Sequence, residues 1–322
     1  MKHLVILLVF FIAIPSIAQN KKQNVILLEK STTLFNFITK KDKLIEADSD
    51  LIAGIQDLCW TQDGRYIYFS GMWHKSDYSD YTPEKWSIYR YSLEIQTTKL
   101  FIDSAFNVAV DRTGNKIAVG RLVNGNRDIY VTDSIGESFK RITSHPAEDF
   151  APSWSPDGKQ IVFNSKRDGK RPEIYIVNAD STDLKRLTFG VPSGSYNPAW
   201  SPDGKFVVYY FESGDRKDQI YLMKPDGSES INISNDTLNN YFPGWINKNT
   251  IVYTQDLPDK KSSKIIILTS DGKEKKPLPD IVSYYARFSK DEKMIAYIDG
   301  YENCIKVISS DGQLKTKIKL SK

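Results

Sequence analysis

The stretch FAPSWSPDGKQIVFNS, residues 150–165, has the pattern of a short strand, a tight turn and a second strand. Much of it returns as YNPAWSPDGKFVVYYF at residues 196–211. In both copies a proline fixes φ where the turn begins, and an Asp-Gly pair provides the backbone freedom that a sharp reversal needs. The second strand of each copy is almost wholly apolar, which is typical of a strand covered on both faces. The repetition indicates that one structural unit is used more than once.

The same unit can be followed along the chain from its anchor, an aromatic or apolar residue that directly precedes the turn. The anchors are Trp60, Val110, Trp154, Trp200, Trp245 and Phe288. Their spacing is close to the roughly 40–45 residues of a four-stranded propeller blade. One blade cannot bury its own faces, whereas a closed ring of blades does. We therefore predict an all-β chain that forms a six-bladed β-propeller of four-stranded antiparallel blades, or seven blades if the N-terminal segment forms part of an extra blade.

Residues 1–18 have the features of a secretory signal peptide. Lys2 supplies a positive charge, residues 4–14 are uninterrupted apolar residues, and small residues suit cleavage before Gln19. The apolar run is about 11 residues long, whereas a membrane-spanning helix needs roughly 20. We expect a periplasmic or secreted protein with no transmembrane segment in the mature chain.

Composition limits the partners and the redox chemistry of the chain. Lys and Arg total 44 against 40 Asp and Glu, a balance that argues against nucleic acid as a partner. The two cysteines, Cys59 and Cys304, fall in the first and the last repeat. A disulfide between them is possible on this pattern, but we favour two buried free thiols.

The motifs PSWSPDGK and PAWSPDGK, at residues 152–159 and 198–205, resemble the WD40-like repeat of the TolB-like β-propellers. The resemblance extends over residues 57–320 and implies a periplasmic propeller that binds proteins. TolB itself carries an α/β domain before its propeller, whereas only residues 19–55 lie between the signal peptide and the repeats here. We expect this extension to clasp the last blade or to cover the edge of the ring, and residues 56–322 to form the propeller.

One face of the predicted ring is rich in aromatic residues. In a propeller, the loops that lead into the first strands lie on the face opposite the Asp-Gly turns. The residues that stand four positions before the anchors are Gln56, Phe106, Phe150, Tyr196, Tyr241 and Tyr284, and all except Gln56 are aromatic. Packing between blades would explain the rings, and we favour it for the two phenylalanines. The three tyrosines have polar tips suited to a half-solvated position, so they are candidate ligand-binding residues.

The loop of the first unit, residues 71–87, adds Trp73 and Tyr78 to these candidates. Clustered aromatic residues in a loop commonly mark an interaction site, although the loop could also fold over the rim and bury some of them. The equivalent loops of the third and fourth units, residues 166–171 and 212–218, are charged instead. An aromatic and partly basic face would suit an acidic peptide or an acidic glycan.

Few residues are available for catalysis. Only two histidines follow the signal peptide, which excludes a three-histidine metal site, and there is no G-x-S-x-G motif or phosphate-binding glycine loop. We expect no metal and no cofactor. The best constellation is His145, Glu148 and Asp149, which could abstract a proton as in a polysaccharide lyase. We favour a non-catalytic propeller that binds an envelope protein or peptide, and a glycan-active or glycan-binding propeller for acidic oligosaccharides is the alternative.

Overall fold

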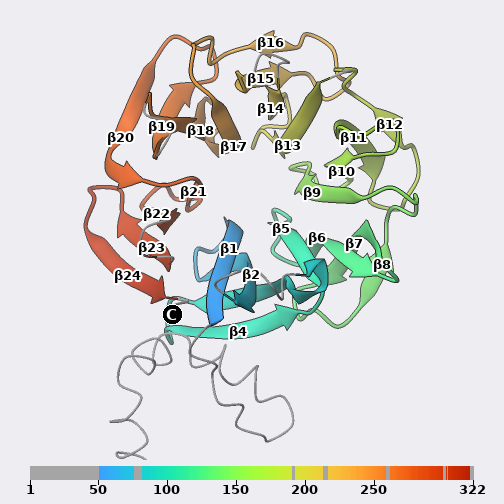
Figure 1. Ribbon diagram of the computed structural model, residues 1–322, viewed down its shortest axis with the longest axis horizontal. Helices are drawn as coiled ribbons and strands as arrows, with labels where there is room; N and C mark the ends of the chain where they lie inside the picture. The colour runs from blue at the N-terminus through green and yellow to red at the C-terminus, as the bar shows by residue number, and fades with distance from the viewer. Residues whose placement is uncertain are drawn as a thin grey trace, which may run out of the picture.

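Six four-stranded antiparallel sheets surround a central axis, and in each sheet the strands lie in chain order from the innermost to the outermost (Figure 1). The computed structural model describes residues 51–75, 82–190, 193–212, 217–258, 262–299, 302 and 304–319. Over these residues the chain is an all-β, six-bladed propeller, so the prediction from the repeat is confirmed. The signal peptide and nearly all of the N-terminal extension lie outside the described residues.

Each blade contributes one strand to each of four concentric layers. The inner strands are β1 (Leu51–Trp60), β5 (Ala105–Val110), β9 (Asp149–Trp154), β13 (Gly194–Trp200), β17 (Asn240–Asn247) and β21 (Ala286–Phe288). The second strands are β2 (Tyr66–Lys75), β6 (Lys116–Val123), β10 (Gln160–Ser165), β14 (Val207–Glu212), β18 (Thr250–Asp256) and β22 (Met294–Asp299). The third strands are β3 (Ser87–Ser92), β7 (Asn126–Asp133), β11 (Glu173–Asn178), β15 (Gln219–Met223), β19 (Ser263–Thr269) and β23 (Cys304–Ser309). The outer strands are β4 (Thr97–Ile102), β8 (Phe139–Arg141), β12 (Lys185–Arg186), β16 (Ile231–Asn232), β20 (Lys275–Val282) and β24 (Leu314–Lys319).

The hydrophobic core is divided among the seams between neighbouring blades. At the seam between the second and third blades, Trp154 and Phe163 pack with Ala118 and Ile129 of the preceding blade. Each of the other five seams has a buried apolar cluster of the same kind. The second strands are therefore covered on both faces, which is why their sequences are continuous apolar runs rather than alternating ones.

The ring closes where the sixth blade meets the first, and among the described residues no strand is exchanged between these blades. Ile298 and Ile305 of the last blade share a buried cluster with Phe69 of the first. The indole Nε1 of Trp60 donates a hydrogen bond of 3.0 Å to the carbonyl oxygen of Arg287. Side-chain packing and hydrogen bonds thus hold this seam. No helix among the described residues is long and apolar enough to cross a membrane.

The inner strands of the first five blades have a β-bulge a few residues before the anchor. At this point Asn107, Ala151, Asn197 and Phe242 have positive φ angles, in the second to fifth blades respectively. A bulge bends its strand and re-aims the side chains that follow it. In the inner strands, the residues between the bulge and the turn are those that line the channel.

Candidate functional site

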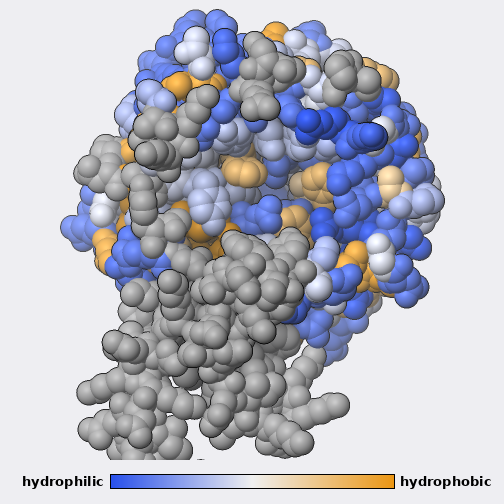
Figure 2. Space-filling view, viewed as in Figure 1, coloured by the Kyte–Doolittle hydropathy of each residue, from blue (hydrophilic) through white to orange (hydrophobic). Residues whose placement is uncertain are grey.

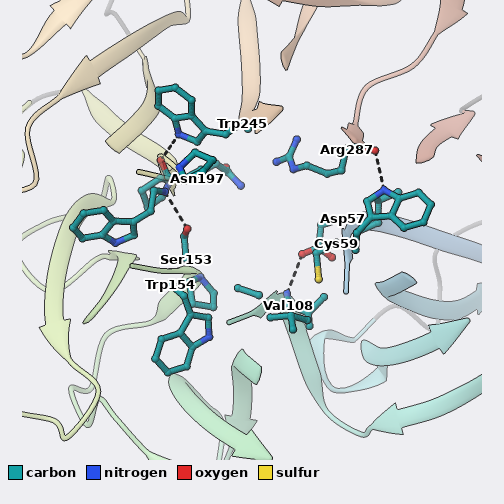
Figure 3. Close-up of a pocket in the computed structure, with 18 of the residues that line it drawn as sticks. Asp57, Cys59, Val108, Ser153, Trp154, Asn197, Trp245 and Arg287 are labelled. Atoms are coloured by element: carbon teal, nitrogen blue, oxygen red, sulfur yellow. Dashed lines mark hydrogen bonds between the residues drawn. The ribbon is translucent and has the colours of Figure 1, made fainter. Parts of the chain in front are cut away.

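The central channel holds a cavity of about 340 Å³, a size within the range of ligand-binding pockets. It lies where the inner strands approach the Asp-Gly turns, and we call this the turn end of the channel. The residues directly before the anchors all line it: Cys59, Ala109, Ser153, Ala199, Gly244 and Arg287. Five of these residues are small, so the sixth, Arg287, is the one long side chain in this layer. Figure 3 shows its guanidinium pointing from β21 into the open centre.

The guanidinium of Arg287 is held by neutral acceptors. Its Nη1 donates to the carbonyl oxygens of Phe242 at 3.2 Å and Ala286 at 2.8 Å. Its Nη2 donates to the carbonyl oxygen of Pro243 at 3.1 Å and to the hydroxyl of Tyr285 at 2.8 Å. Among the described residues, no carboxylate forms an ion pair with it. The side chain is fixed in position, but its positive charge is not neutralised.

Asp57 is the acidic residue of the cavity wall, and both of its oxygens are occupied. Its Oδ1 accepts the Ser70 N–H at 3.2 Å, and its Oδ2 accepts the Asn107 amide at 3.0 Å and the Val108 N–H at 3.3 Å. Asn107 in turn accepts the Ala151 N–H at 3.1 Å, so this network joins the first three blades. Burial raises the pKa of Asp57 although these hydrogen bonds favour its charged form. The carboxyl group is a structural link.

Both cysteines are free, as the sequence favoured. Cys304 is fully buried, whereas Cys59 is partly exposed at the channel wall. Burial and the nearby charge of Asp57 raise the pKa of the Cys59 thiol to about 12. This thiol is therefore protonated at neutral pH and is a poor nucleophile.

The predicted tyrosines lie where the inner strands begin, at the end of the channel opposite the turn end, and we call this the tyrosine face. None of the three tyrosines lines the cavity. The hydroxyl of Tyr196 donates to Glu212 at 2.8 Å, and that of Tyr241 donates to Asp256 at 2.5 Å. The ring of Tyr210 stacks on Tyr196 with a centroid separation of 5.0 Å and meets Tyr241 edge-on at 6.0 Å. Two neighbouring blades thus present a continuous aromatic cluster.

The third predicted tyrosine has a different role in the structure. Tyr284 donates a hydrogen bond of 2.8 Å to the carbonyl oxygen of Ile55, across the seam that closes the ring. Trp73 belongs to β2, where its backbone pairs with Ala53, and Tyr78 lies outside the described residues. In the same unit Trp86 is buried and packs edge-on against the ring of Phe106.

Two basic residues near the tyrosine face are paired with carboxylates. Lys166 pairs with Glu148 at 2.6 Å, and Arg171 pairs with Glu212 at 3.0 Å. Burial, together with the charges of Glu212 and Asp256, raises the pKa of Asp218 to about 6. The described part of this face is therefore less basic than the sequence of its loops indicates, and it is acidic around the tyrosines.

The three catalytic candidates do not share a hydrogen bond or ion pair with one another among the described residues; they are His145, Glu148 and Asp149. Asp149 is fully buried and pairs with Arg167 at 3.0 Å, while Glu148 is held by its ion pair with Lys166. Burial opposes the ionisation of Glu148, but the hydrogen bond from Lys166 and the charges of Arg127 and Lys166 together outweigh it and lower its pKa. His145 lines a second cavity, of about 220 Å³, with residues of the second and third blades. Both carboxylates are engaged in ion pairs. Burial raises the pKa of Asp149 although its hydrogen bonds and the charge of Arg167 favour the charged form, and the fully buried group is closed to a substrate.

Arg287 was not among the residues that we singled out from the sequence. The signal for it was present once the repeats were aligned, because the position before the anchor is small in five units and Arg in the sixth. A lone long side chain in a layer of small ones projects into the space that the others leave.

Comparison with known proteins identifies the family of this six-bladed propeller. Residues 68–285 match the family described as the TolB beta propeller domain, and the chain belongs to this family. The Tol-Pal system protein TolB of Syntrophus aciditrophicus is 38% identical over 52 residues, which are 16% of this chain and 11% of that protein. The protein TolB homolog of Chlorobium luteolum is 33% identical over 67 residues, 21% of this chain and 15% of the relative.

Solved structures show the same fold at low sequence identity. A putative TolB from Agrobacterium tumefaciens superposes with a TM-score of 0.62 and 20% identity, covering 76% of this chain and 91% of that one. TolB from Acinetobacter baumannii gives 0.60 and 17%, covering 82% and 78%. An oligogalacturonate lyase in complex with manganese gives 0.56 and 13%, covering 85% and 80%. These similarities establish the architecture of the ring.

Proposed function

We propose that this protein is exported to the periplasm or secreted, and that it binds a protein or peptide of the cell envelope through the tyrosine face without catalysing a reaction. Membership of the TolB beta propeller family supports a binding role, and the signal-peptide features of residues 1–18 support export. The ion pairs that engage Glu148 and Asp149 weigh against the lyase-like alternative.

The aromatic cluster of Tyr196, Tyr210 and Tyr241 is the observation that carries this proposal. Glu212 and Asp256 accept hydrogen bonds from two of the hydroxyls and so hold the rings in place. Rings that are already fixed lose little conformational freedom when a partner binds, and tyrosine is enriched among the residues that dominate binding energy. The cluster is therefore suited to anchor a partner's side chains.

The test is affinity capture from envelope extract with mature wild-type protein and with the double variant Tyr196→Ala, Tyr241→Ala. Phe189→Ala is the matched control, because Phe189 is a 74% exposed ring that follows the outer strand β12. A protein retained by the wild type is purified and titrated against all three forms, after circular dichroism has shown that they fold. We expect the double variant to lose at least about 30-fold in affinity, since one hot-spot residue contributes about 2 kcal/mol.

Equal affinity of the double variant and the wild type would overturn the proposed face. Retention of no protein, together with cleavage of acidic oligosaccharides that His145→Ala abolishes, would favour the glycan-active alternative instead. Loss of affinity in the Phe189→Ala control would place the contact on the rim of the ring.

A further inference from the structure

We infer that the cavity at the turn end of the channel binds a peptide carboxylate, with Arg287 as its anion-binding group. This site lies at the opposite end of the inner strands from the tyrosine face, so it does not depend on the proposed function. Figure 2 shows one face of the ring, hollowed at its centre, and Figure 3 shows the cavity itself.

The first argument is charge. The cavity wall includes three cationic side chains, Arg112, Arg287 and Lys290, and its acidic member among the described residues is Asp57. Both oxygens of Asp57 already accept hydrogen bonds from the first and second blades. The cavity therefore carries an excess of positive charge in a partly enclosed space, where an anion is attracted more strongly than at an open surface.

The second argument is the space and the hydrogen bonds that hold the guanidinium of Arg287. A Cβ atom at Gly244 would lie only 2.8 Å from Cζ of Arg287 and 2.9 Å from its Nε, so the glycine makes room for the group. All four hydrogens on the two Nη atoms have acceptors in the surrounding backbone and Tyr285, which leaves Nε–H without an acceptor among the described residues. Arginine with a free N–H and an unneutralised charge is suited to a carboxylate.

The third argument concerns the molecule that carries the carboxylate. Pro152, Pro198 and Pro243 occupy the position two before the anchor in three successive blades, and all three line the cavity. The amide of Asn107 is engaged with Asp57 and the third blade, whereas the side chain of Asn197 faces the centre (Figure 3) and has no hydrogen-bond partner among the described residues. Three rigid apolar side chains beside a free amide and a cation give the mixed apolar and polar wall that suits the terminus or acidic side chain of a peptide.

The experiment uses N-acetylated pentapeptide pools in three forms: a free C-terminal acid and a C-terminal amide of one composition without charged side chains, and an end-capped form in which one residue is Asp or Glu. Digalacturonate is the fourth probe. Binding to the mature protein is measured by calorimetry and by the fluorescence of the tryptophans that border the cavity. The variants are Arg287→Met, which keeps the length without the charge, and Gly244→Ala, which displaces the guanidinium. Gly169→Ala is the control, because a Cβ there would meet nothing within 4 Å.

We expect the wild type and Gly169→Ala to bind a carboxylate-bearing pool, and Arg287→Met and Gly244→Ala to bind it at least tenfold more weakly. The free-acid and end-capped pools separate a chain terminus from an acidic side chain as the source. Equal binding of the uncharged amide pool, unchanged binding by both variants, or no binding of any pool at millimolar concentration would overturn the inference. Binding of digalacturonate alone would assign the cavity to acidic sugars and overturn the peptide. The Tyr196→Ala, Tyr241→Ala variant should bind the peptides as the wild type does, which keeps this result separate from the tyrosine face.

Discussion

The two ends of the channel are built from the same six strands and differ in charge. At the tyrosine face, hydroxyls donate to Glu212 and Asp256, and burial together with these two charges raises the pKa of Asp218 to about 6. At the turn end, Arg287 is held by backbone carbonyls and a tyrosine hydroxyl, without an ion-pair partner among the described residues.

This difference shows how a repeat combines a uniform fold with distinct sites. The seams and turns recur because each blade must bury the same faces. The positions that face the channel are free to differ, because a side chain there borders the open centre. One substitution in such a layer, Arg for a small residue, changes the charge of one end without disturbing the blades.

Replacement of Asp57, which lies between the two ends of the channel, should have the largest effect on stability. Asp57→Ala removes the acceptor of Asn107, Val108 and Ser70, and leaves these buried donors without a partner. We expect the free energy of unfolding to fall by about 3–5 kcal/mol, the usual cost of breaking a buried charged network. Urea denaturation followed by circular dichroism measures this change. Glu137→Ala, at an exposed position, is the control and should stay within about 0.5 kcal/mol of the wild type. A loss no larger than that of the control would show that the blades hold together without this network.

The six blades could be predicted from the sequence because the features that fix them are local and repeated. Trp154 and Trp200 end inner strands as expected, and Gly158 and Gly204 take the positive φ angles that their turns require. In the sixth unit Glu292 adopts the same conformation with φ of 60° without being a glycine. The ring imposes the turn even where the sequence signal is weak.

The channel could be predicted only in part, because its polar contacts join residues far apart in the chain. The pairing of Asp57 with Asn107 crosses 50 residues, and the carbonyl of Phe242 reaches Arg287 across 45. The tyrosines were recognised by type and spacing, but whether their hydroxyls meet carboxylates depends on the neighbouring strand. A sequence pattern predicts on which face of the ring a side chain lies, but not which residue it contacts.

The hydrogen bonds of the tyrosine face should have a smaller effect on stability than the Asp57 network. Tyr241→Phe removes the hydroxyl that donates to Asp256, and Asp256 keeps hydrogen bonds from Asn239 and Ser263 at 3.1 Å each. We expect a loss of about 1–2 kcal/mol in the free energy of unfolding, since the acceptor is charged. Thermal and urea denaturation of the variant measure it. Tyr66→Phe is the matched control, because the Tyr66 hydroxyl has no hydrogen-bond partner among the described residues, and an equal loss there would contradict the assigned role.

The acidic character of the tyrosine face predicts a small gain in stability for Asp218→Asn. The folded-state pKa of Asp218, about 6, lies above the ordinary value because of burial and the charges of Glu212 and Asp256. Below about pH 4, the group is protonated in both states and costs nothing. As the pH rises from about 4 to about 6, Asp218 ionises in the unfolded chain while it stays protonated in the folded protein, so the folded state loses stability until both forms are ionised. Asparagine removes this loss, and we expect a gain of about 1 kcal/mol at pH 7.5, after discounting for solvent screening.

Urea denaturation of the wild type and Asp218→Asn at pH 4, 5.5 and 7.5 measures this gain and its pH dependence. The difference between the two proteins should shrink as the pH falls and vanish near pH 4. A gain of the same size at pH 4 would mean that the amide improves local packing, and the electrostatic contrast between the two ends would then lose its support at Asp218. A gain confined to higher pH would show that burial and the charges of Glu212 and Asp256 penalise Asp218 in the folded protein, because both act on the ionised carboxylate.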